Sequence, residues 1–317
     1  MIISVINYKG GVGKTTMTAN IAAEMAYRGK KVLVLDLDPQ TNLTFSFLTV
    51  EQWQHAYQHQ TIKRWYDAFI DKDEELDLKD FITRPERAHK RLRALEATGI
   101  LDLIPSHLGL VNVDNDLAIK IWKGNQGVTE RSHRYEYLRI LSRLKTGLIP
   151  LAKNEYDIIL IDCPPNLNYV TQTAIIASDG LLIPAKPDYL STLGISELKQ
   201  HLNQLIEDYN SKAQMEPYGY KPICPYWLGV VFTMVGLWKN EPYQTLQDYI
   251  DRVKRQQIGT FETLITENKT DYSEAPEKGI PVVLTPASKD RYASIHMRLK
   301  ALTSEVEAKI QQMKSGR

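Results

Sequence analysis

The hydrophobic positions of the chain alternate between short continuous runs and longer stretches with helical spacing. Runs of about five apolar residues are typical of strands whose two faces are both buried. They lie at residues 2–6, 31–36, 100–104, 157–162, 180–184 and 228–232. Helical stretches lie between or after them, at about 17–28, 135–148, 196–209, 243–256 and 290–313. This alternation predicts an α/β fold, with a doubly wound, mostly parallel sheet and helices on both of its faces.

The segment from about residue 49 to residue 99 fits this alternation poorly, because it is polar and helix-prone throughout. Its apolar anchors are aromatic: Trp53, Tyr57, Trp65, Tyr66 and Phe69. We favour a packing face over a ligand cage as the use of these side chains. Residues 49–99 are therefore interpreted as a helical insertion within a single domain that spans residues 1–317.

Composition and charge narrow the classes of function. Hydrophobic residues make up 43% of the 317 residues and charged residues 24%, which is ordinary for a soluble globular protein. The formal net charge is +1, so any binding to nucleic acid must use local basic patches. Cys163 and Cys224 have no metal-binding spacing and indicate a reducing compartment. No run approaches the ~20 apolar residues of a membrane span, and a core strand stands where a signal peptide would be. We therefore expect a cytoplasmic protein.

The first apolar run leads into a glycine-rich loop, residues 7–16, with the sequence NYKGGVGKTT. Glycines let the backbone curl so that its N–H groups converge on phosphate oxygens. Lys14 supplies a positive charge to the outer phosphates, Thr15 offers a hydroxyl to Mg²⁺, and the following helix points its positive end at the same anion. We therefore expect a nucleoside triphosphate with Mg²⁺ on a P-loop NTPase fold. The predicted nucleotide-binding residues are Lys9, Gly10, Gly11, Val12, Gly13, Lys14, Thr15 and Thr16.

Three aspartates lie at the carboxyl ends of predicted strands, where ligands bind in open α/β sheets. Asp36 and Asp38 end the second strand, and the period of two places them on the same side. Asp162 follows four apolar residues, as expected of a carboxylate that holds hydrated Mg²⁺. Thr15 and Asp162 are therefore predicted metal ligands, and Asp36 and Asp38 should face the phosphate loop. Cys163, directly after Asp162, is expected to be a small buried residue.

The phosphate loop departs from the regular pattern G-x-x-x-x-G-K-T/S, because Tyr8 occupies the place of the first glycine and a second lysine, Lys9, follows it. The form x-K-G-G-x-G-K-T-T resembles the deviant Walker loop of the ParA/MinD family of dimeric ATPases. The segments at 36–42 and 162–165 also match the family's D-x-D-P-Q-x-N and D-x-P-P motifs, and residues 274–276 match its Glu-Ala-Pro element. The resemblance covers about three quarters of the chain and is weakest in the insertion.

The resemblance implies roles for the residues of the site. Lys9 would reach across a homodimer to the partner's nucleotide, so that ATP binding drives dimerisation. Asp38 would orient the attacking water, and Asp36 would lie nearer the magnesium shell, so that Thr15, Asp36 and Asp162 form the expected metal site. Lys9, Lys14 and Asp38 are thus the expected catalytic residues of a Mg²⁺-dependent ATP hydrolysis. Thr233 and Met234, at the end of the sixth strand-like run, lie where the family holds adenine.

Members of the family differ in whether they bind DNA or a membrane, and we favour the DNA-binding partition (ParA) type. Such ATPases bind DNA non-specifically on the nucleoid and position a plasmid, a chromosome origin or a protein assembly. A ParB-like protein or a cargo adaptor stimulates their hydrolysis. MinD-type members instead bind membranes through an amphipathic tail, but the tail at 301–314 has mixed charge and lacks a bulky apolar face. The alternatives are a MinD-like, membrane-associated ATPase and a metabolic enzyme, such as a ligase, on the same scaffold.

Clustered basic residues are the candidates for DNA contact, because counterion release rewards them whatever the DNA sequence. In the C-terminal third they are Arg252, Lys254, Arg255, Lys269, Lys289, Arg291, Arg298 and Lys300. A second cluster lies in the insertion: Arg84, Arg87, Lys90, Arg91 and Arg93. Asp271 stands where family members often carry an arginine. Either Lys269 replaces that charge or the DNA contacts use other residues.

Overall fold

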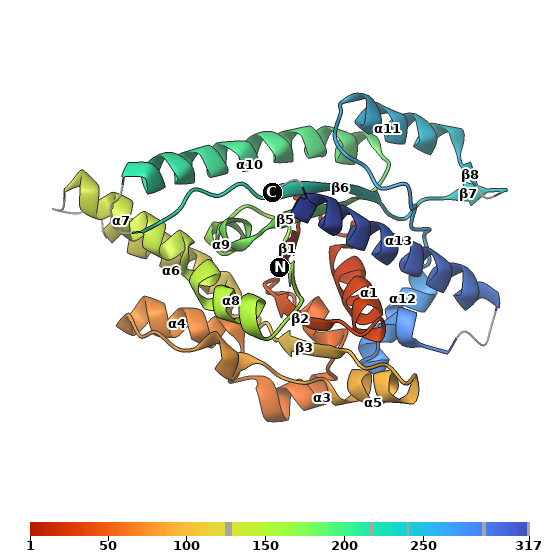
Figure 1. Cartoon of the computed structure of the whole chain (residues 1–317), viewed down its shortest axis with the longest axis horizontal. Helices are drawn as coiled ribbons and strands as arrows, with labels where there is room; N and C mark the ends of the chain where they lie inside the picture. Colours follow the sequence, from red (N-terminus) through yellow and green to blue (C-terminus); the bar gives the residue numbers. More distant parts are fainter. Residues whose placement is uncertain (124–128, 216–218, 240, 287–289, 316–317) are drawn as a thin grey trace.

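The computed structural model describes residues 1–123, 129–215, 219–239, 241–286 and 290–315. Its centre is one sheet of six parallel strands in the order β3-β2-β4-β1-β5-β6 (Figure 1). The strands are β1 (Ile2–Val5), β2 (Lys31–Asp36), β3 (Ile100–Ile104), β4 (Ile158–Asp162), β5 (Gly180–Ala185) and β6 (Tyr226–Phe232). The predicted α/β class and the six predicted strands are confirmed.

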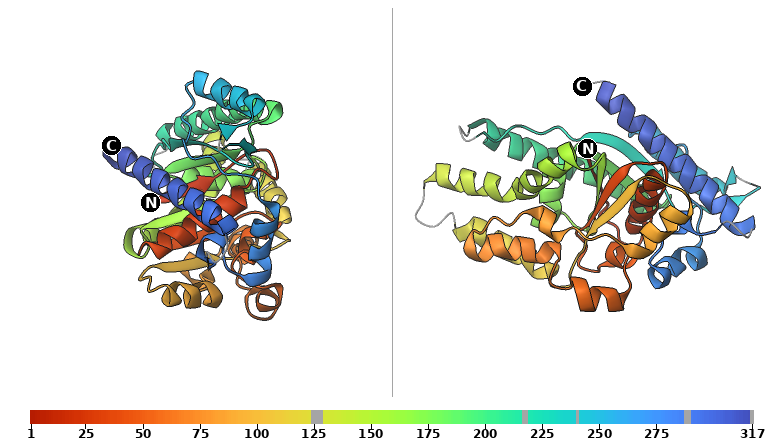
Figure 2. Two further views of the ribbon diagram at one scale, coloured as in Figure 1. Left: turned by 90° about the vertical axis from the view of Figure 1, so that its right-hand side faces the viewer. Right: turned by 60° about the horizontal axis from the view of Figure 1, so that its bottom comes forward.

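Both faces of this sheet are covered, because successive strand residues point to opposite sides. Ile2 and Leu35 belong to one hydrophobic cluster, while Ile3 and Val34 belong to the other. The first cluster packs under α6 (Leu110–Lys123), α7 (Glu130–Leu141), α8 (Arg143–Asn154), α9 (Tyr169–Ala177) and α10 (Tyr189–Met215). The second packs under α1 (Lys14–Tyr27) and α13 (Asp290–Ser315). Figure 2 shows α1 and α13 lying side by side on their face of the sheet.

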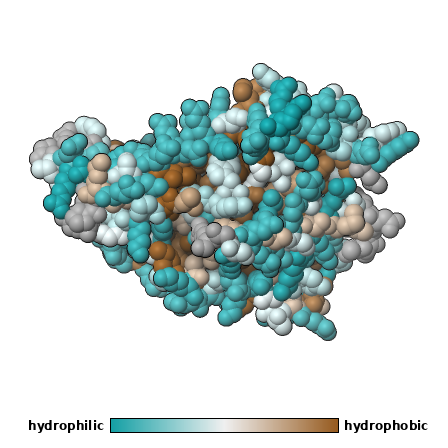
Figure 3. Space-filling view, turned by 45° about the horizontal axis from the view of Figure 1, so that its top comes forward, coloured by the Kyte–Doolittle hydropathy of each residue, from teal (hydrophilic) through white to brown (hydrophobic). Residues whose placement is uncertain are grey.

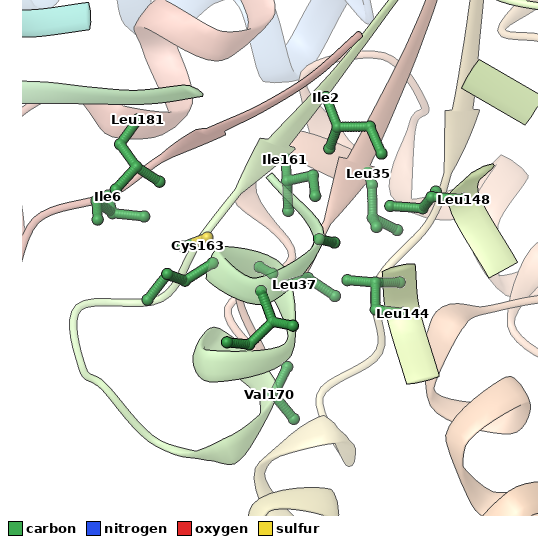
Figure 4. Packing of buried hydrophobic residues seen from close by; sticks show 14 of the residues in the cluster. Ile2, Ile6, Leu35, Leu37, Leu144, Leu148, Ile161, Cys163, Val170 and Leu181 are labelled. Carbon is green, nitrogen blue, oxygen red and sulfur yellow. The ribbon is translucent and has the colours of Figure 1, made fainter. Parts of the chain in front are cut away.

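Figure 4 shows the first cluster from close by, with Leu35 and Ile161 of the sheet facing Leu144 and Leu148 of α8. The outer surface differs from this interior. The face drawn in Figure 3 is mostly hydrophilic, with smaller hydrophobic patches between the polar residues. Among the described residues, no helix combines the length and the apolar composition that crossing a bilayer requires.

Several helices differ from the sequence expectation. The single helix expected at 135–148 is two helices, α7 and α8, that meet at Ser142, whose hydroxyl lies 2.7 Å from the Tyr209 hydroxyl of α10. The helix expected at 196–209 is the middle of the longer α10. The sequence analysis did not predict α6, α9, α12 (Lys269–Lys278) or the β7–β8 hairpin (Leu237–Trp238 and Glu241–Pro242). Between that hairpin and α12 lies α11 (Gln244–Arg255).

Residues 42–94 form a series of short helices in the lower half of Figure 1, to the left of β3 and below it. They are α2 (Asn42–Phe45), α3 (Val50–Gln52), the π-helix η1 (Trp53–Tyr57), α4 (Ile62–Lys72), the 3₁₀-helix η2 (Leu78–Phe81) and α5 (Glu86–Ala94). Trp65, Tyr66 and Phe69 are at most 1% exposed and belong to the same cluster as Leu35. Trp53 packs in the other cluster. These aromatic side chains therefore contact the core; the limits of the domain itself stay a prediction.

We expect the Trp65→Ala substitution to lower the free energy of unfolding by about 3–5 kcal/mol, because a large buried side chain would leave a cavity. The indole nitrogen of Trp65 donates to the Leu76 carbonyl (2.9 Å), and its ring lies against Gly147 of α8. The measurement is urea unfolding. Val50→Ala, at a side chain 53% exposed, is the control and should cost less than about 0.5 kcal/mol. Equal losses for the two variants would contradict the packing role of the insertion.

Candidate functional site

The phosphate loop connects β1 to α1 and takes conformations that need glycine. Gly11 (φ 67°) and Gly13 (φ 84°) are left-handed, and Gly13 caps the first turn of α1. Asn7 fixes the loop to the sheet: its side-chain amide donates to the Pro184 carbonyl (2.8 Å) and its side-chain oxygen accepts from the Lys9 amide (2.9 Å). A cleft of about 410 Å³ opens over the loop.

This cleft brings residues from several predicted motifs together. Among its lining residues are Gly10, Gly11, Gly13, Lys14, Thr15, Thr16, Asp38, Asn42, Phe45, Pro165, Met234 and Tyr272. Lys14 is only 6% exposed, and its ammonium donates to the carbonyls of Asn7 (3.1 Å) and Lys9 (3.2 Å). Burial lowers the pKa of Lys14, while Asp162 and Asp38 oppose this shift. The lysine therefore lies within the loop, at the base of the cleft.

Thr15 and Asp162, two of the predicted metal ligands, are in contact. The Thr15 hydroxyl donates to Asp162 Oδ2 (2.6 Å), and the Thr18 hydroxyl lies 3.4 Å from Oδ1. Asp162 is fully buried, and burial, followed by the nearby Asp36 charge, raises the pKa of its carboxyl well above the ordinary value. A hydroxyl next to a carboxylate is an all-oxygen donor set of the kind that Mg²⁺ prefers. These two residues fit a magnesium ion.

Asp36, the third predicted ligand, has a different environment. It is fully buried, and it accepts hydrogen bonds from the amide (2.8 Å) and hydroxyl (2.7 Å) of Thr44 and from the Asp38 amide (3.1 Å). Burial raises the pKa of its carboxyl from 3.8 to about 7. Asp36 does not line the cleft and holds the turn that carries Asp38. Its place in a magnesium shell stays a prediction.

Asp38 lines the cleft and is positioned by a residue that the sequence analysis missed. Its side chain accepts from the Gln40 amide (2.9 Å), and its carbonyl accepts from the Ser106 hydroxyl (2.8 Å). Ser106 is fully buried; its amide donates to the Thr44 hydroxyl (2.9 Å), and its carbonyl accepts from the Trp53 indole (3.2 Å). The signal that could have found Ser106 is its place just beyond the carboxyl end of the third strand.

Lys9 points away from the cleft within its own chain. Its ammonium contacts both carboxylate oxygens of Asp188 (2.8 and 3.0 Å) and the Ser191 hydroxyl (3.1 Å), at the start of α10. The two charged side chains are 36% and 40% exposed. An exposed ion pair of this kind stabilises the folded protein by about 0–1 kcal/mol. Lys9 can therefore leave Asp188 for another partner at little cost in free energy.

The residues expected near adenine lie beside the phosphate loop. A smaller hollow of about 100 Å³ adjoins the main cleft, and Thr233, Met234, Ile265, Asn268 and Tyr272 are among its lining residues. The Thr233 hydroxyl donates to the Val12 carbonyl of the loop (2.8 Å). Most of this lining is apolar, which suits a planar base. Tyr272, which lines both hollows, was not identified from the sequence.

The candidate DNA-binding residues are spread over several elements. Arg252, Lys254 and Arg255 are exposed in the last turn of α11, where Lys254 pairs with Glu262 (3.3 Å). Arg298 is half-buried and donates to the Leu264 carbonyl (3.0 Å). Lys289 lies outside the described residues, as do the side chains of Lys269, Arg291 and the Glu-Ala-Pro element at 274–276.

Two other expectations concern buried positions. Asp271 is 1% exposed and accepts from the Asn268 side chain (2.6 Å), so it does not present its charge to a ligand at the surface. Cys163 is fully buried, as expected, and burial raises the pKa of its thiol well above the ordinary value. Neither residue lines the cleft.

We expect Asp36→Asn to remove a pH dependence of stability. The folded protein holds the Asp36 proton up to about pH 7, whereas an ordinary carboxyl releases it near pH 3.8. The contribution of Asp36 to the free energy of unfolding is therefore fully present below pH 3.8 and is lost as the pH rises to 7. The loss is at most about 1.4 kcal/mol per pH unit. Urea unfolding between pH 4 and 7 measures the difference between wild type and variant. A difference that stays constant over this range would refute the expectation; Asp80→Asn, at an exposed aspartate, is the control.

Comparison with known proteins agrees with this geometry. The model of a family described as an AAA domain matches residues 1–215. The sporulation initiation inhibitor protein Soj of Bacillus subtilis is 30% identical over 285 residues, which cover 89% of this chain and 90% of that protein. The chromosome partitioning protein ParA of Myxococcus xanthus is 30% identical over 283 residues, which cover 89% of this chain and 81% of that protein.

A solved structure has the same fold. The complex of Cyanothece McdA(D38A) with ATP matches with a TM-score of 0.65 and 21% identity, over 98% of this chain and 96% of that one. The similarity to Soj and ParA extends over most of the chain and is not confined to the phosphate loop. The chain therefore belongs to the ParA/MinD family of ATPases and is of the ParA type.

Proposed function

We propose that this protein is a Mg²⁺-dependent ATPase that dimerises on ATP, binds DNA non-specifically and positions or segregates a cargo. A ParB-like or cargo-adaptor protein would stimulate hydrolysis, and the protein would work in the cytoplasm on the nucleoid. One observation carries the proposal: Lys14, Thr15 and Asp38 line one cleft, and Asp162 is bonded to Thr15 at its base. The relative named as a chromosome partitioning protein supports the proposed role in segregating a cargo.

The cleft has the parts that a triphosphate and its metal need. The amides of Gly10 to Thr16 and the N-terminus of α1 would bind the phosphates. The Thr15 hydroxyl would bind Mg²⁺ directly and Asp162 would hold it through water. When bound, the metal neutralises charge on the outer phosphates. The adjoining apolar hollow at Thr233 and Met234 would take the base.

The chemistry needs charge and position more than reactive side chains. The Lys14 ammonium would exchange its two loop carbonyls for phosphate oxygens. Asp38, held at the cleft by the Gln40 amide and Ser106, would align the attacking water in line with the outer phosphate. Because the transition state spreads charge over several oxygens, a second cation would lower the barrier further.

Lys9 would supply that cation from the partner subunit. To do so it leaves Asp188, and the exposed pair is weak enough to exchange for a triphosphate that carries several charges. A site completed only in the dimer makes ATP binding the switch and hydrolysis its timer. This in-trans role rests on the family resemblance.

The membrane-binding alternative is disfavoured by the C-terminal helix. Leu299, Leu302, Val306 and Met313 of α13 are at most 3% exposed, and α13 packs along α1. The apolar side of the helix is thus used in the core and is not presented to a bilayer. A metabolic enzyme on the same scaffold would show ATP turnover that depends on a small substrate, without ATP-dependent dimerisation.

Two substitutions separate dimerisation from turnover. Lys9→Ala should abolish ATP-dependent dimerisation or turnover, because the shared cation is lost. Asp38→Ala should trap an ATP-bound dimer, because the water is no longer aligned. Gel filtration with Mg²⁺ and ATP, together with phosphate release, measures both effects. Lys153→Ala, at an exposed lysine of α8, is the control. If both variants elute and turn over like wild type, the proposed mechanism is wrong.

The Ser106 hydrogen bond gives a further test. Ser106→Ala should lower kcat by about tenfold with little change in the affinity for ATP, because Asp38 is displaced while the phosphate loop is untouched. Ser142→Ala also removes a buried hydroxyl, but one that contacts Tyr209 far from the cleft, and should leave kcat unchanged. A Ser106→Ala enzyme with normal kcat would show that Asp38 needs no support from this residue.

A further inference from the structure

A second cleft, of about 160 Å³, lies between the insertion and the C-terminal helix. Arg91 of α5, Tyr27 at the end of α1, and His296 and Lys300 of α13 line it, next to the 3₁₀-helix η3 (Val282–Leu284). No lining residue is acidic, and the cleft shares no lining residue with the nucleotide cleft. We call it the basic cleft. We infer that it binds the phosphodiester backbone of nucleic acid.

The fold brings together two basic segments that are far apart in the sequence. The Arg91 guanidinium donates to the Leu284 carbonyl (2.6 Å) across a sequence separation of 193 residues. The Arg87 guanidinium donates to the Lys278 carbonyl (3.1 Å) at the end of α12. Figure 1 shows the result, with α5 below α1 and α12; α5 contacts both α1 and η3. Arginines of the insertion and lysines of the C-terminal third therefore share one flank of the molecule.

The charges on this flank are not cancelled by neighbouring carboxylates. Arg87 and Arg91 donate to neutral carbonyls, Arg93 is exposed, and the Lys300 ammonium lies 5.5 Å from the centre of the Tyr27 ring. Within the part of the chain that the structure describes, none of these four cations forms an ion pair. Other basic residues nearby are paired: Lys90 with Glu86, and Arg84 with Asp102. Arg87, Arg91 and Lys300 are thus cations of this flank whose charge no carboxylate pairs in the described part of the chain.

The arrangement suits an extended polyanion better than a single small anion. Arg87 and Arg91 are one helical turn apart, about 6 Å along the axis of α5, and Lys300 of α13 lines the same cleft as Arg91. Guanidinium groups hydrogen-bond phosphate through a planar fork, and a row of them can follow a backbone without reading its sequence. This inference rests on the proposed function and adds to it a contact surface supplied by the insertion.

The test compares two pairs of charge reversals that change the net charge of the chain equally. Arg91→Glu with Lys300→Glu reverses the charge of two residues that line the basic cleft. Lys72→Glu with Lys153→Glu alters exposed lysines of α4 and α8, on another side of the molecule, and is the matched control. The full-length proteins are titrated against a labelled DNA duplex of arbitrary sequence, with ATP, with ADP and without nucleotide, over a salt series. Thermal unfolding and ATP turnover of each variant check that the fold and the nucleotide site are intact.

We expect the basic-cleft pair to weaken ATP-dependent binding at least tenfold at one salt concentration, and the control pair to stay within about twofold of wild type. The slope of log affinity against log salt should fall by about one for each DNA phosphate that the variant no longer neutralises. Arg91→Gln with Lys300→Gln, which only removes charge, should weaken binding at least threefold even if the charge reversal disturbs folding.

The two ways of failing are distinguishable. If wild type binds DNA with ATP and the two pairs weaken binding equally, the basic cleft is not the contact surface and the proposed function stands. If wild type binds no DNA in any nucleotide state at low salt, both the basic cleft and the DNA-binding part of the proposed function are overturned.

Discussion

The structure depends on the burial of charged groups at the carboxyl edge of the sheet. Lys14, Asp36 and Asp162 are almost or fully buried there. Burial lowers the pKa of Lys14 and raises the pKa of the two aspartates, so it favours the uncharged form of each. Hydrogen bonds from Thr15, Thr44 and the loop carbonyls offset part of this cost. A bound cation and a polyphosphate would offset more of it, since they bring the missing opposite charges. Ligand binding and the protonation of these three side chains are therefore linked in this protein.

The insertion is coupled to that edge through hydrogen bonds and packing. The Trp53 indole donates a hydrogen bond to the Ser106 carbonyl, and the Ser106 hydroxyl donates one to the Asp38 carbonyl. Trp65 and Phe69 anchor the same segment in the core below β2. A segment that looks peripheral in the sequence is thus joined to a proposed catalytic residue on one side. On the other side, α5 adds positive charge to the flank that carries α13.

Most of the sheet and the phosphate loop could be predicted from the sequence, because both are local patterns. A strand that is buried on both faces must be continuously apolar. A phosphate loop whose backbone is left-handed at positions 11 and 13 favours glycine at both. The features that could not be predicted depend on contacts between residues that are distant in the sequence. Ser142, where α7 and α8 meet, contacts Tyr209, which lies 67 residues away, and the partner of Lys9 lies 179 residues away. Ser106 carries no motif, and the basic cleft exists only once α5 packs beside η3.

The Thr233 hydroxyl joins two parts of the nucleotide site that are usually considered separately. It lines the hollow proposed for the base and also bonds the Val12 carbonyl of the phosphate loop. A base that pushes Thr233 aside would loosen the backbone that cradles the phosphates. Discrimination among nucleotides would then be visible in the speed of the chemical step as well as in the strength of binding.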